Sequence, residues 1–233
     1  MTTTEYLTEI LQTYNLVAVL SEKNGGKVLR LRHKELKKDL VLRQYPQAVA
    51  AYNIIKTLRC ENLPEVYDVI DCGDGQIVLE EYIDGMTVAQ IMETGQYHPR
   101  GAQKVLHGVC NALTVLHSRS IVHRDVKPEN VMVTATGRVV LIDLNAARQV
   151  TNASRDTVIL GTVGYASPEQ LGVSQSDART DIYAAGVLLN VMLTGEHPSV
   201  RLANGRLGQI VEKCTAISPS HRYKSARKLS ETL

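Results

Sequence analysis

The amino-acid sequence predicts an α+β fold with two lobes. The first is a small antiparallel β lobe with one main helix over residues 1–82, and the second is a larger helical lobe over residues 83–233. Polar and apolar residues alternate repeatedly before Gly85, which is the pattern of half-buried antiparallel strands. Beyond Gly85, apolar residues recur at helical spacing. A chain of 233 residues has room for this bilobal arrangement and can bury a hydrophobic core.

Four strands and one helix are expected in the first lobe. The strands are predicted at residues 27–33, 39–45, 66–70 and 76–82. Each alternates polar with apolar residues, and turn residues separate the members of each pair. The helix is predicted over residues 47–59, which contain neither Gly nor Pro and carry apolar residues on a helical period.

Helices dominate the prediction for the second lobe. A short helix is expected at residues 88–93, followed by a long one at residues 100–118 with an apolar stripe. Two short strands are expected at residues 131–133 and 139–142, joined by a Thr-Gly turn. From Asp181 onward the pattern is again helical.

Composition favours a cytoplasmic protein without a nucleic-acid partner. The 26 basic and 24 acidic residues nearly balance, with a formal net charge of +2. The four cysteines form no Cys-x-x-Cys pair, as expected of reduced thiols. The N-terminus does not resemble a signal peptide, and the longest apolar run, residues 184–193, is too short to cross a bilayer. We therefore expect a cytoplasmic chain with no membrane segment, or the cytoplasmic domain of a longer membrane-anchored protein.

The octet His123-Arg-Asp-Val-Lys-Pro-Glu-Asn130 is the strongest functional signal in the chain. It places a carboxylate (Asp125), an ammonium (Lys127) and an amide (Asn130) in one short loop. Phosphoryl transfer uses a carboxylate to orient a hydroxyl, a cation near the migrating phosphoryl group and an oxygen ligand for Mg²⁺. The octet resembles the H-R-D-x-x-x-x-N catalytic loop of protein kinases.

Further blocks extend this resemblance over nearly the whole chain. Asp143 stands where protein kinases have an aspartate that binds Mg²⁺. Glu169 ends a segment similar to the Gly-Thr to Ala-Pro-Glu block, and Arg222 resembles the arginine that forms a salt bridge with that glutamate. Asp181 resembles the buried aspartate that braces the catalytic loop. The resemblance implies a protein-kinase-like fold with these catalytic and metal-binding residues: Asp125, Lys127, Asn130 and Asp143.

The acceptor is expected to be serine or threonine. Lys127 together with Thr162 resembles serine/threonine kinases, in which the threonine hydrogen-bonds with the catalytic aspartate and lysine. Residues 142–148 and the Ser-Pro-Glu-Gln string resemble bacterial, Firmicutes-type kinases of the eukaryotic-like class. The resemblance also implies that Arg124 senses a phosphorylated activation loop, in which Thr157 is the best phosphosite candidate.

The first lobe departs from the kinase pattern. When Val28 is aligned with the valine that closes the glycine-rich loop, Gly26 is the one loop glycine that matches. Arg43 stands where kinases have their ATP-binding lysine, and its head is wider and planar. Ala51 stands where the helix supplies the glutamate that pairs with this lysine, and residues 47–58 contain no acidic residue.

A different partner for Arg43 is present in the sequence. Residues 80–85 resemble the hinge, with Glu81 to Ile83 on the adenine edge and Glu80 at the gatekeeper position. Because a buried carboxylate requires a cation close by, we expect Glu80 to pair with Arg43. The alternative is a shifted register that leaves Glu80 in solvent.

These observations predict a Ser/Thr protein kinase that transfers the γ-phosphoryl group of ATP, bound with Mg²⁺ or Mn²⁺, to a protein substrate and to itself. The resemblance implies nucleotide contacts from Gly26, Val28, Arg43, Glu80, Glu81 and Ile83. The changes in the first lobe keep open an alternative function, a pseudokinase that binds nucleotide or acts as a scaffold. A small-molecule phosphotransferase of similar fold is a third hypothesis. A homodimer is also left open.

Overall fold

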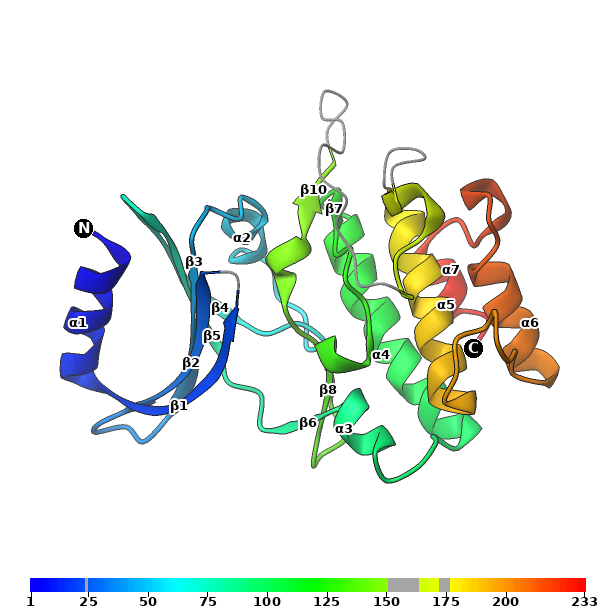
Figure 1. Cartoon of the computed structure of the whole chain (residues 1–233), viewed down its shortest axis with the longest axis horizontal. Helices are drawn as coiled ribbons and strands as arrows, with labels where there is room; N and C mark the ends of the chain where they lie inside the picture. The colour runs from blue at the N-terminus through cyan, green and yellow to red at the C-terminus, as the bar shows by residue number, and fades with distance from the viewer. Residues whose placement is uncertain (24, 151–163, 172–176) are drawn as a thin grey trace. The chain divides into compact units, whose positions relative to one another are not determined.

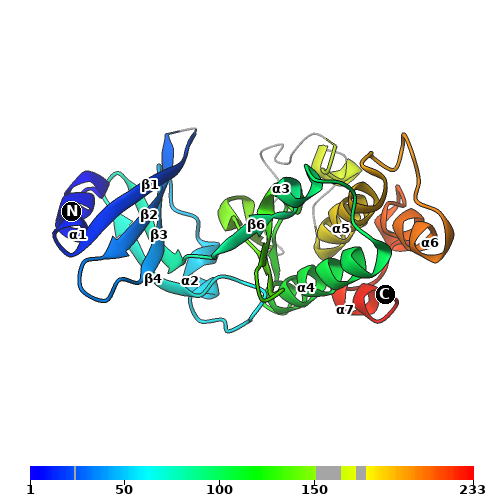
Figure 2. The same cartoon turned by 90° about the horizontal axis from the view of Figure 1, so that it is seen from below.

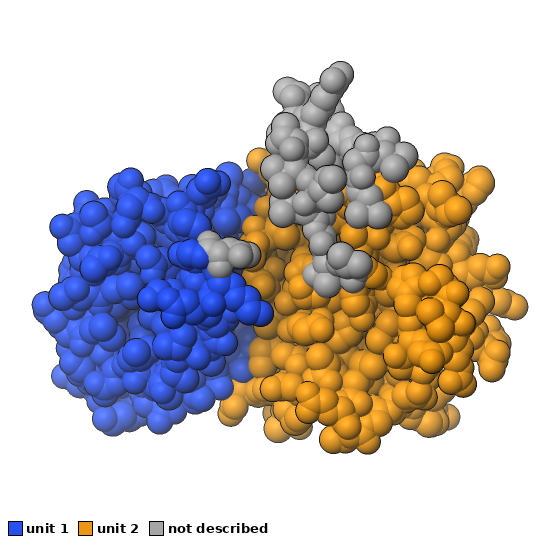
Figure 3. All heavy atoms as spheres, in the orientation of Figure 1, with its two compact units in different colours: residues 1–59, 64–83 blue, residues 60–63, 84–233 orange. Residues whose placement is uncertain are grey.

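The structure is a computed structural model, and it describes residues 1–23, 25–150, 164–171 and 177–233 (Figure 1). These residues form two compact units, coloured separately in Figure 3. The first unit comprises residues 1–59 and 64–83, and the second comprises residues 60–63 and 84–233.

A five-stranded antiparallel sheet forms the centre of the first unit, with the strand order β1-β2-β3-β5-β4. The strands are β1 (Tyr14–Lys23), β2 (Gly26–His33), β3 (Asp39–Tyr45), β4 (Val66–Cys72) and β5 (Gly75–Glu81). The four predicted strands are confirmed as β2 to β5, and β1 is an addition to them. One face of the sheet carries the buried core residues Leu29, Leu31, Leu40, Leu42 and Ile77.

A helix that the sequence analysis did not anticipate packs on this face. Helix α1 (Thr3–Thr13) contributes Ile10 to the core cluster, and Figure 1 shows it alongside the sheet. It begins with a capping box, in which the Thr2 hydroxyl accepts from the Glu5 amide and the Glu5 carboxylate accepts from the Thr2 amide. The Thr2-x-x-Glu5 spacing is the sequence signal that could have predicted it.

The prediction of a helix over residues 47–59 was wrong about its length. Helix α2 (Ala51–Ile55) is much shorter than expected. Before its start, residues 46–49 are not helical, and the Val49 amide donates to the side chain of Gln76 at 3.0 Å. At its end, the amides of Thr57 and Leu58 bond to carbonyls three residues back, which is the tighter 3₁₀ pattern.

Helices form most of the second unit. They are α3 (Val88–Met92), α4 (Pro99–His117), α5 (Ala178–Thr194), α6 (Gly205–Cys214) and α7 (Ala226–Ser230). The two helices predicted after Gly85 are confirmed as α3 and α4. Helix α4 packs against α5 and α7, and α5 packs against α6, as both views show (Figures 1 and 2). Among the helices of the described residues, none is long and apolar enough to cross a membrane.

Short strands of the second unit frame the loop that carries the octet. Strands β6 (Gly85–Thr87), β8 (Val131–Thr134) and β9 (Val139–Leu141) form one sheet, in the order β6-β8-β9. Strand β7 (Ile121–Val122) pairs with β10 (Arg148–Gln149). Residues 123–130 therefore connect β7 to β8, with strand pairing on both sides.

Candidate active site

A buried residue of α5 holds the loop at residues 123–130 in place through hydrogen bonds to its backbone. Asp181, which is 0% exposed, accepts the backbone N–H of His123 at 2.9 Å and that of Arg124 at 2.8 Å. His117 Nε2, in the last turn of α4, lies 2.8 Å from the same carboxylate. Arg124 has a φ of 70°, which is uncommon for a residue other than glycine. The hydrogen bonds to Asp181 hold this conformation.

These contacts keep Asp181 ionised although it is buried. Burial acts to raise the pKa of this carboxyl, but its interactions with His117, with His123 and with the Arg124 amide outweigh that effect and lower the pKa. His117 was not among the predicted site residues. Its contact with Asp181 joins positions 64 residues apart, so no local motif identifies it.

Three polar side chains of the loop meet at one point. Asp125 Oδ2 lies 2.7 Å from Lys127 Nζ and accepts a hydrogen bond of 2.8 Å from Asn130 Nδ2. Asn130 Nδ2 also donates to the Asp125 carbonyl oxygen at 2.8 Å. Asn130 ends a short 3₁₀ turn, Pro128–Asn130, which returns its side chain toward Asp125. The loop thus presents a carboxylate, a cation and an amide together.

Asp143 follows β9 and is joined to this loop through its neighbour. The Ile142 amide donates to the Asn130 carbonyl oxygen at 2.8 Å, and His123 Nε2 lies 3.2 Å from the Ile142 carbonyl oxygen. Asp143 has a left-handed backbone, with φ 63° and ψ 76°, and buried Leu144 follows it. Ile142, the residue before Asp143, is therefore hydrogen-bonded to Asn130 through the backbone.

The donor groups fit a metal ion that binds together with phosphate. Both hydrogen bonds from the Asn130 amide to Asp125 use Nδ2, so the amide oxygen is the atom suited to ligate a metal, and Asp143 supplies a carboxylate. Mg²⁺ commonly takes one or two protein oxygens and completes its shell with phosphates and water. Within the described residues, no cluster of three or more His, Cys, Asp or Glu could hold a metal. The site fits a metal–nucleotide complex better than a protein cage.

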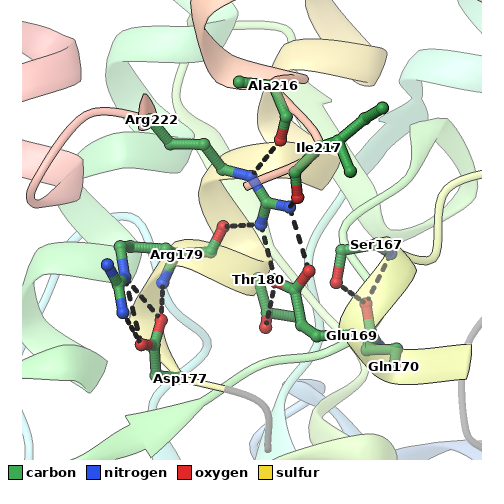
Figure 4. A network of polar contacts seen from close by, with 9 residues as sticks. All are labelled: Ser167, Glu169, Gln170, Asp177, Arg179, Thr180, Ala216, Ile217 and Arg222. Carbon is green, nitrogen blue, oxygen red and sulfur yellow. Dashed lines mark hydrogen bonds and ion pairs between the residues drawn. The ribbon is translucent and has the colours of Figure 1, made fainter. Parts of the chain in front are cut away.

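A buried ion pair lies in another part of the second unit (Figure 4). Arg222 and Glu169 form two parallel contacts of 2.6 and 2.9 Å. Their exposed fractions are 3% and 4%. The Arg222 guanidinium also donates to the carbonyl oxygens of Arg179, Ala216 and Ile217. This network joins the segment that ends at Leu171 to the start of α5 and to the loop before Arg222.

Gln170 connects the same segment to the catalytic loop. Its Oε1 accepts the Ser167 amide at 3.0 Å, and its Nε2 donates to the Arg124 carbonyl oxygen at 2.9 Å. Gln170 was not among the predicted site residues. The contact with Arg124 spans 46 positions, so spacing along the chain does not reveal it.

In the first unit, Arg43 of β3 and Glu80 of β5 form a buried ion pair. Arg43 Nε donates to Glu80 Oε1 at 2.6 Å, and the two side chains are 9% and 3% exposed. The ladder pairs Val41 with Glu80 and Arg43 with Val78, so Arg43 and Glu80 are diagonal neighbours on one face. The shifted register that would leave Glu80 in solvent is therefore excluded.

Gly26 and Val28 lie on the first two strands of this sheet. Val28 is directly opposite Arg43 in the β2–β3 ladder. A side chain at Gly26 would come within 2.9 Å of the Gln44 carbonyl oxygen. Close strand packing therefore already requires glycine at this position.

The predicted hinge segment continues from β5. The Glu81 amide donates to the Glu65 carbonyl oxygen at 2.8 Å, and Ile83 is 5% exposed. Between them, the ring of Tyr82 lies 4.0 Å from the Arg30 guanidinium. Two other predicted site residues, Thr157 and Thr162, lie outside the described residues.

Comparison with known proteins gives matches that span most of the chain. The chain matches the protein kinase domain model over residues 17–233. It is 32% identical to serine/threonine-protein kinase PknB of Mycobacterium leprae over 206 residues, which are 74% of this chain and 33% of that protein. It is 31% identical to serine/threonine-protein kinase PrkC of Bacillus subtilis, covering 72% of this chain and 30% of that protein. It is 37% identical to serine/threonine-protein kinase PknL of Mycobacterium tuberculosis, covering 66% of this chain and 41% of that protein.

A strand-rich unit, a helical unit and an anchored His-Arg-Asp loop define a protein of the kinase fold class. The chain belongs to the protein kinase domain family. The predicted α+β fold is thereby confirmed, and so is the resemblance to bacterial serine/threonine kinases. This family uses ATP with a divalent metal ion. The chain spans about a third of the length of the first curated relatives it matches.

Proposed function

We propose that the chain is a catalytic domain that transfers the γ-phosphoryl group of ATP to serine or threonine hydroxyls of proteins, including its own. The contact of Asp125 with both Lys127 and Asn130 is the observation that carries the proposal. The names of the relatives favour the serine/threonine class. The intact carboxylate, cation and amide favour this function over a pseudokinase.

Four residues of the second unit each have a distinct role in this proposal. Asp125 orients the acceptor hydroxyl and takes its proton. Lys127, 2.7 Å from that carboxylate, balances negative charge on the phosphoryl group during transfer. Asn130 and Asp143 ligate Mg²⁺, with Mn²⁺ as the alternative ion. A bound metal ion supplies charge neutralisation at the phosphate oxygens.

The first lobe, residues 1–82, serves nucleotide binding in this proposal, and residues 83–233 serve catalysis and substrate binding. Arg43 binds the α- and β-phosphates. Gly26, Val28 and the hinge residues Glu80 to Ile83 contact the remainder of the nucleotide. The resemblance of these residues to the family pattern and the burial of Arg43 and Glu80 support this assignment.

We place the domain in the cytoplasm, where ATP is abundant, either by itself or as part of a longer membrane-anchored protein. All four cysteines are free, in keeping with a reducing compartment. A homodimer is a further proposal. It is tested by the mass of the purified chain in solution, where a mass of twice the monomer supports it.

Autophosphorylation tests the proposed function. We expect the purified chain to incorporate phosphate on serine or threonine with Mg·ATP. Asp125→Asn should lower kcat by about 10²- to 10⁴-fold, the usual contribution of a general base, while nucleotide binding persists. Asp143→Asn should weaken the binding of Mg·ATP as well, because it removes a metal ligand.

A change in melting temperature on adding Mg·ATP separates the outcomes. Binding without phosphate incorporation would support the pseudokinase alternative. Phosphate incorporation that persists in Asp125→Asn would contradict the role given to Asp125.

A further inference from the structure

Helix α2 offers no carboxylate to the cation on β3. Its residues, Ala51–Ile55, include no acidic side chain. Ala51 stands where kinases have the helix glutamate, and it is 2% exposed. An ion pair from this helix therefore cannot position Arg43.

Two adjacent strands supply the missing pair. Arg43 and Glu80 belong to β3 and β5, which are hydrogen-bonded neighbours in the middle of the sheet. The ladder continues without a register shift from Leu40↔Glu81 to Tyr45↔Gln76. The position of the guanidinium thus follows from strand register, and a displacement of α2 would not break the contact of 2.6 Å.

The helix contributes a neutral, buried neighbour to this pair. Tyr52 is 0% exposed, and its hydroxyl lies 2.9 Å from the Tyr45 hydroxyl. Burial, with added effects of Tyr45 and Glu80, raises the pKa of Tyr52 well above its ordinary value, so its hydroxyl stays protonated. An uncharged buried neighbour keeps water away from Arg43 and Glu80, which strengthens their attraction.

We propose that Glu80 is the positioning residue for Arg43 in nucleotide binding, so that the β3–β5 ladder and not α2 sets the phosphate-binding cation. The proposal rests on the proposed function in one respect, because it requires that Arg43 contact nucleotide phosphates. A guanidinium carries five N–H donors, so a bond from Nε to Glu80 is compatible with further bonds to phosphate. Lysine has one terminal nitrogen, which Glu80 would draw toward itself.

The test measures the affinity for Mg·ADP by calorimetry in the wild type and in three variants. Glu80→Gln removes the charge and keeps the shape, and we expect the Kd to rise about tenfold to hundredfold. Glu80→Asp keeps the charge but withdraws the carboxylate by about 1.5 Å, and it should show a smaller rise. Arg43→Lys restores the usual kinase residue and should nevertheless weaken binding, because lysine cannot serve both partners.

A matched control removes an ion pair that connects the end of the α2 segment to the sheet. Lys56 Nζ contacts Asp68 Oδ1 of β4 at 2.6 Å, and the two side chains are 42% and 48% exposed. Asp68→Asn should leave the Kd for Mg·ADP within about twofold, because exposed pairs contribute little and α2 does not hold Arg43. Thermal unfolding of each variant shows that it is folded, and Glu80→Asp replaces Glu80→Gln where the latter fails to fold.

Three results would overturn the inference: wild-type affinity in a folded Glu80→Gln or Glu80→Asp variant, tighter binding in Arg43→Lys, or a loss in Asp68→Asn equal to that in Glu80→Gln. A wild-type chain that binds no Mg·ADP would overturn it as well. If the wild type binds nucleotide without phosphate transfer, the proposed function fails, and the affinities still decide the role of Glu80.

Discussion

Three carboxylates are buried among the described residues, and each is stabilised in a different way. Glu80, Glu169 and Asp181 are 2%, 4% and 0% exposed. Glu80 contacts an arginine on a neighbouring strand, and Glu169 contacts an arginine far along the chain. Asp181 relies on two backbone amides and a histidine. Because an isolated buried charge is very unfavourable, removing any one of these partners affects folding more than a surface change does.

Arg222→Met tests this for the Glu169 pair. The variant leaves Glu169 buried without its cation, so we expect the free energy of unfolding to fall by about 3–5 kcal/mol. Urea denaturation measures it. The exposed pair Lys228–Glu231 is the control, and Lys228→Met should change stability by about 1 kcal/mol or less. Equal effects of the two substitutions would contradict the importance of burial.

The same pair makes stability depend on pH. Burial acts to raise the pKa of Glu169, but the hydrogen bonds from Arg222 outweigh it and lower the pKa from its ordinary 4.5. A carboxyl with a lowered pKa in the folded state contributes stability above its unfolded value, and this contribution is lost as pH falls through the folded value.

The wild type should therefore exceed Glu169→Gln in stability by a constant amount above about pH 4.5, and the difference should shrink below it. Urea denaturation of both proteins at a series of pH values measures this difference. A difference that stays constant down to about pH 3 would show that the carboxyl does not titrate in this way.

At the scale of elements, the stability of α1 can be tested with two neighbouring residues. Ile10 packs into the core of the first unit and is 9% exposed, whereas Leu11 is 39% exposed. Ile10→Ala should lower the free energy of unfolding by about 2–3 kcal/mol, through lost burial and a cavity. Leu11→Ala should cost about 0.5 kcal/mol or less. Equal losses, measured by urea denaturation, would mean that α1 does not pack on the sheet.

The elements of this chain differ in how well the sequence predicts them. Strands β2 to β5 and helices α3 and α4 have clear periodicity, which follows from one buried face. Helix α2 was predicted too long, because periodicity does not reveal that the chain tightens to i→i−3 bonds at Thr57 and Leu58. Helix α1 was missed although its capping box at Thr2 and Glu5 is visible in the sequence.

The residues of the candidate site also differ in how well the sequence predicts them. Asp125, Lys127 and Asn130 lie within one short loop, so their spacing indicates their chemistry. His117 contacts Asp181, which in turn bonds to the catalytic loop, and Gln170 contacts the loop at Arg124; these contacts join positions 64 and 46 residues apart. The Glu80–Arg43 pair could be predicted because a buried acid on a sheet requires a base on the same face.

At the scale of the whole molecule, the charged groups described above belong to two separate compact units. The described part of the first unit contains the buried cation Arg43, and the second contains Asp125, Asn130 and Asp143. Each unit buries apolar residues of its own, such as Leu42 and Ile77 in the first and Leu113 and Leu188 in the second.

Removal of divalent metal distinguishes a ligand ion from a structural one. Within the described residues, no cluster of three or more His, Cys, Asp or Glu could hold a metal, and Asn130 and Asp143 are too few ligands to retain Mg²⁺ by themselves. We therefore expect EDTA to leave the melting temperature of the nucleotide-free chain unchanged. EDTA should also abolish phosphate transfer and the increase in melting temperature caused by ATP. Activity should return with Mg²⁺ or Mn²⁺. Unfolding of the nucleotide-free chain by EDTA would instead indicate a tightly held ion and would contradict a metal that binds with the nucleotide.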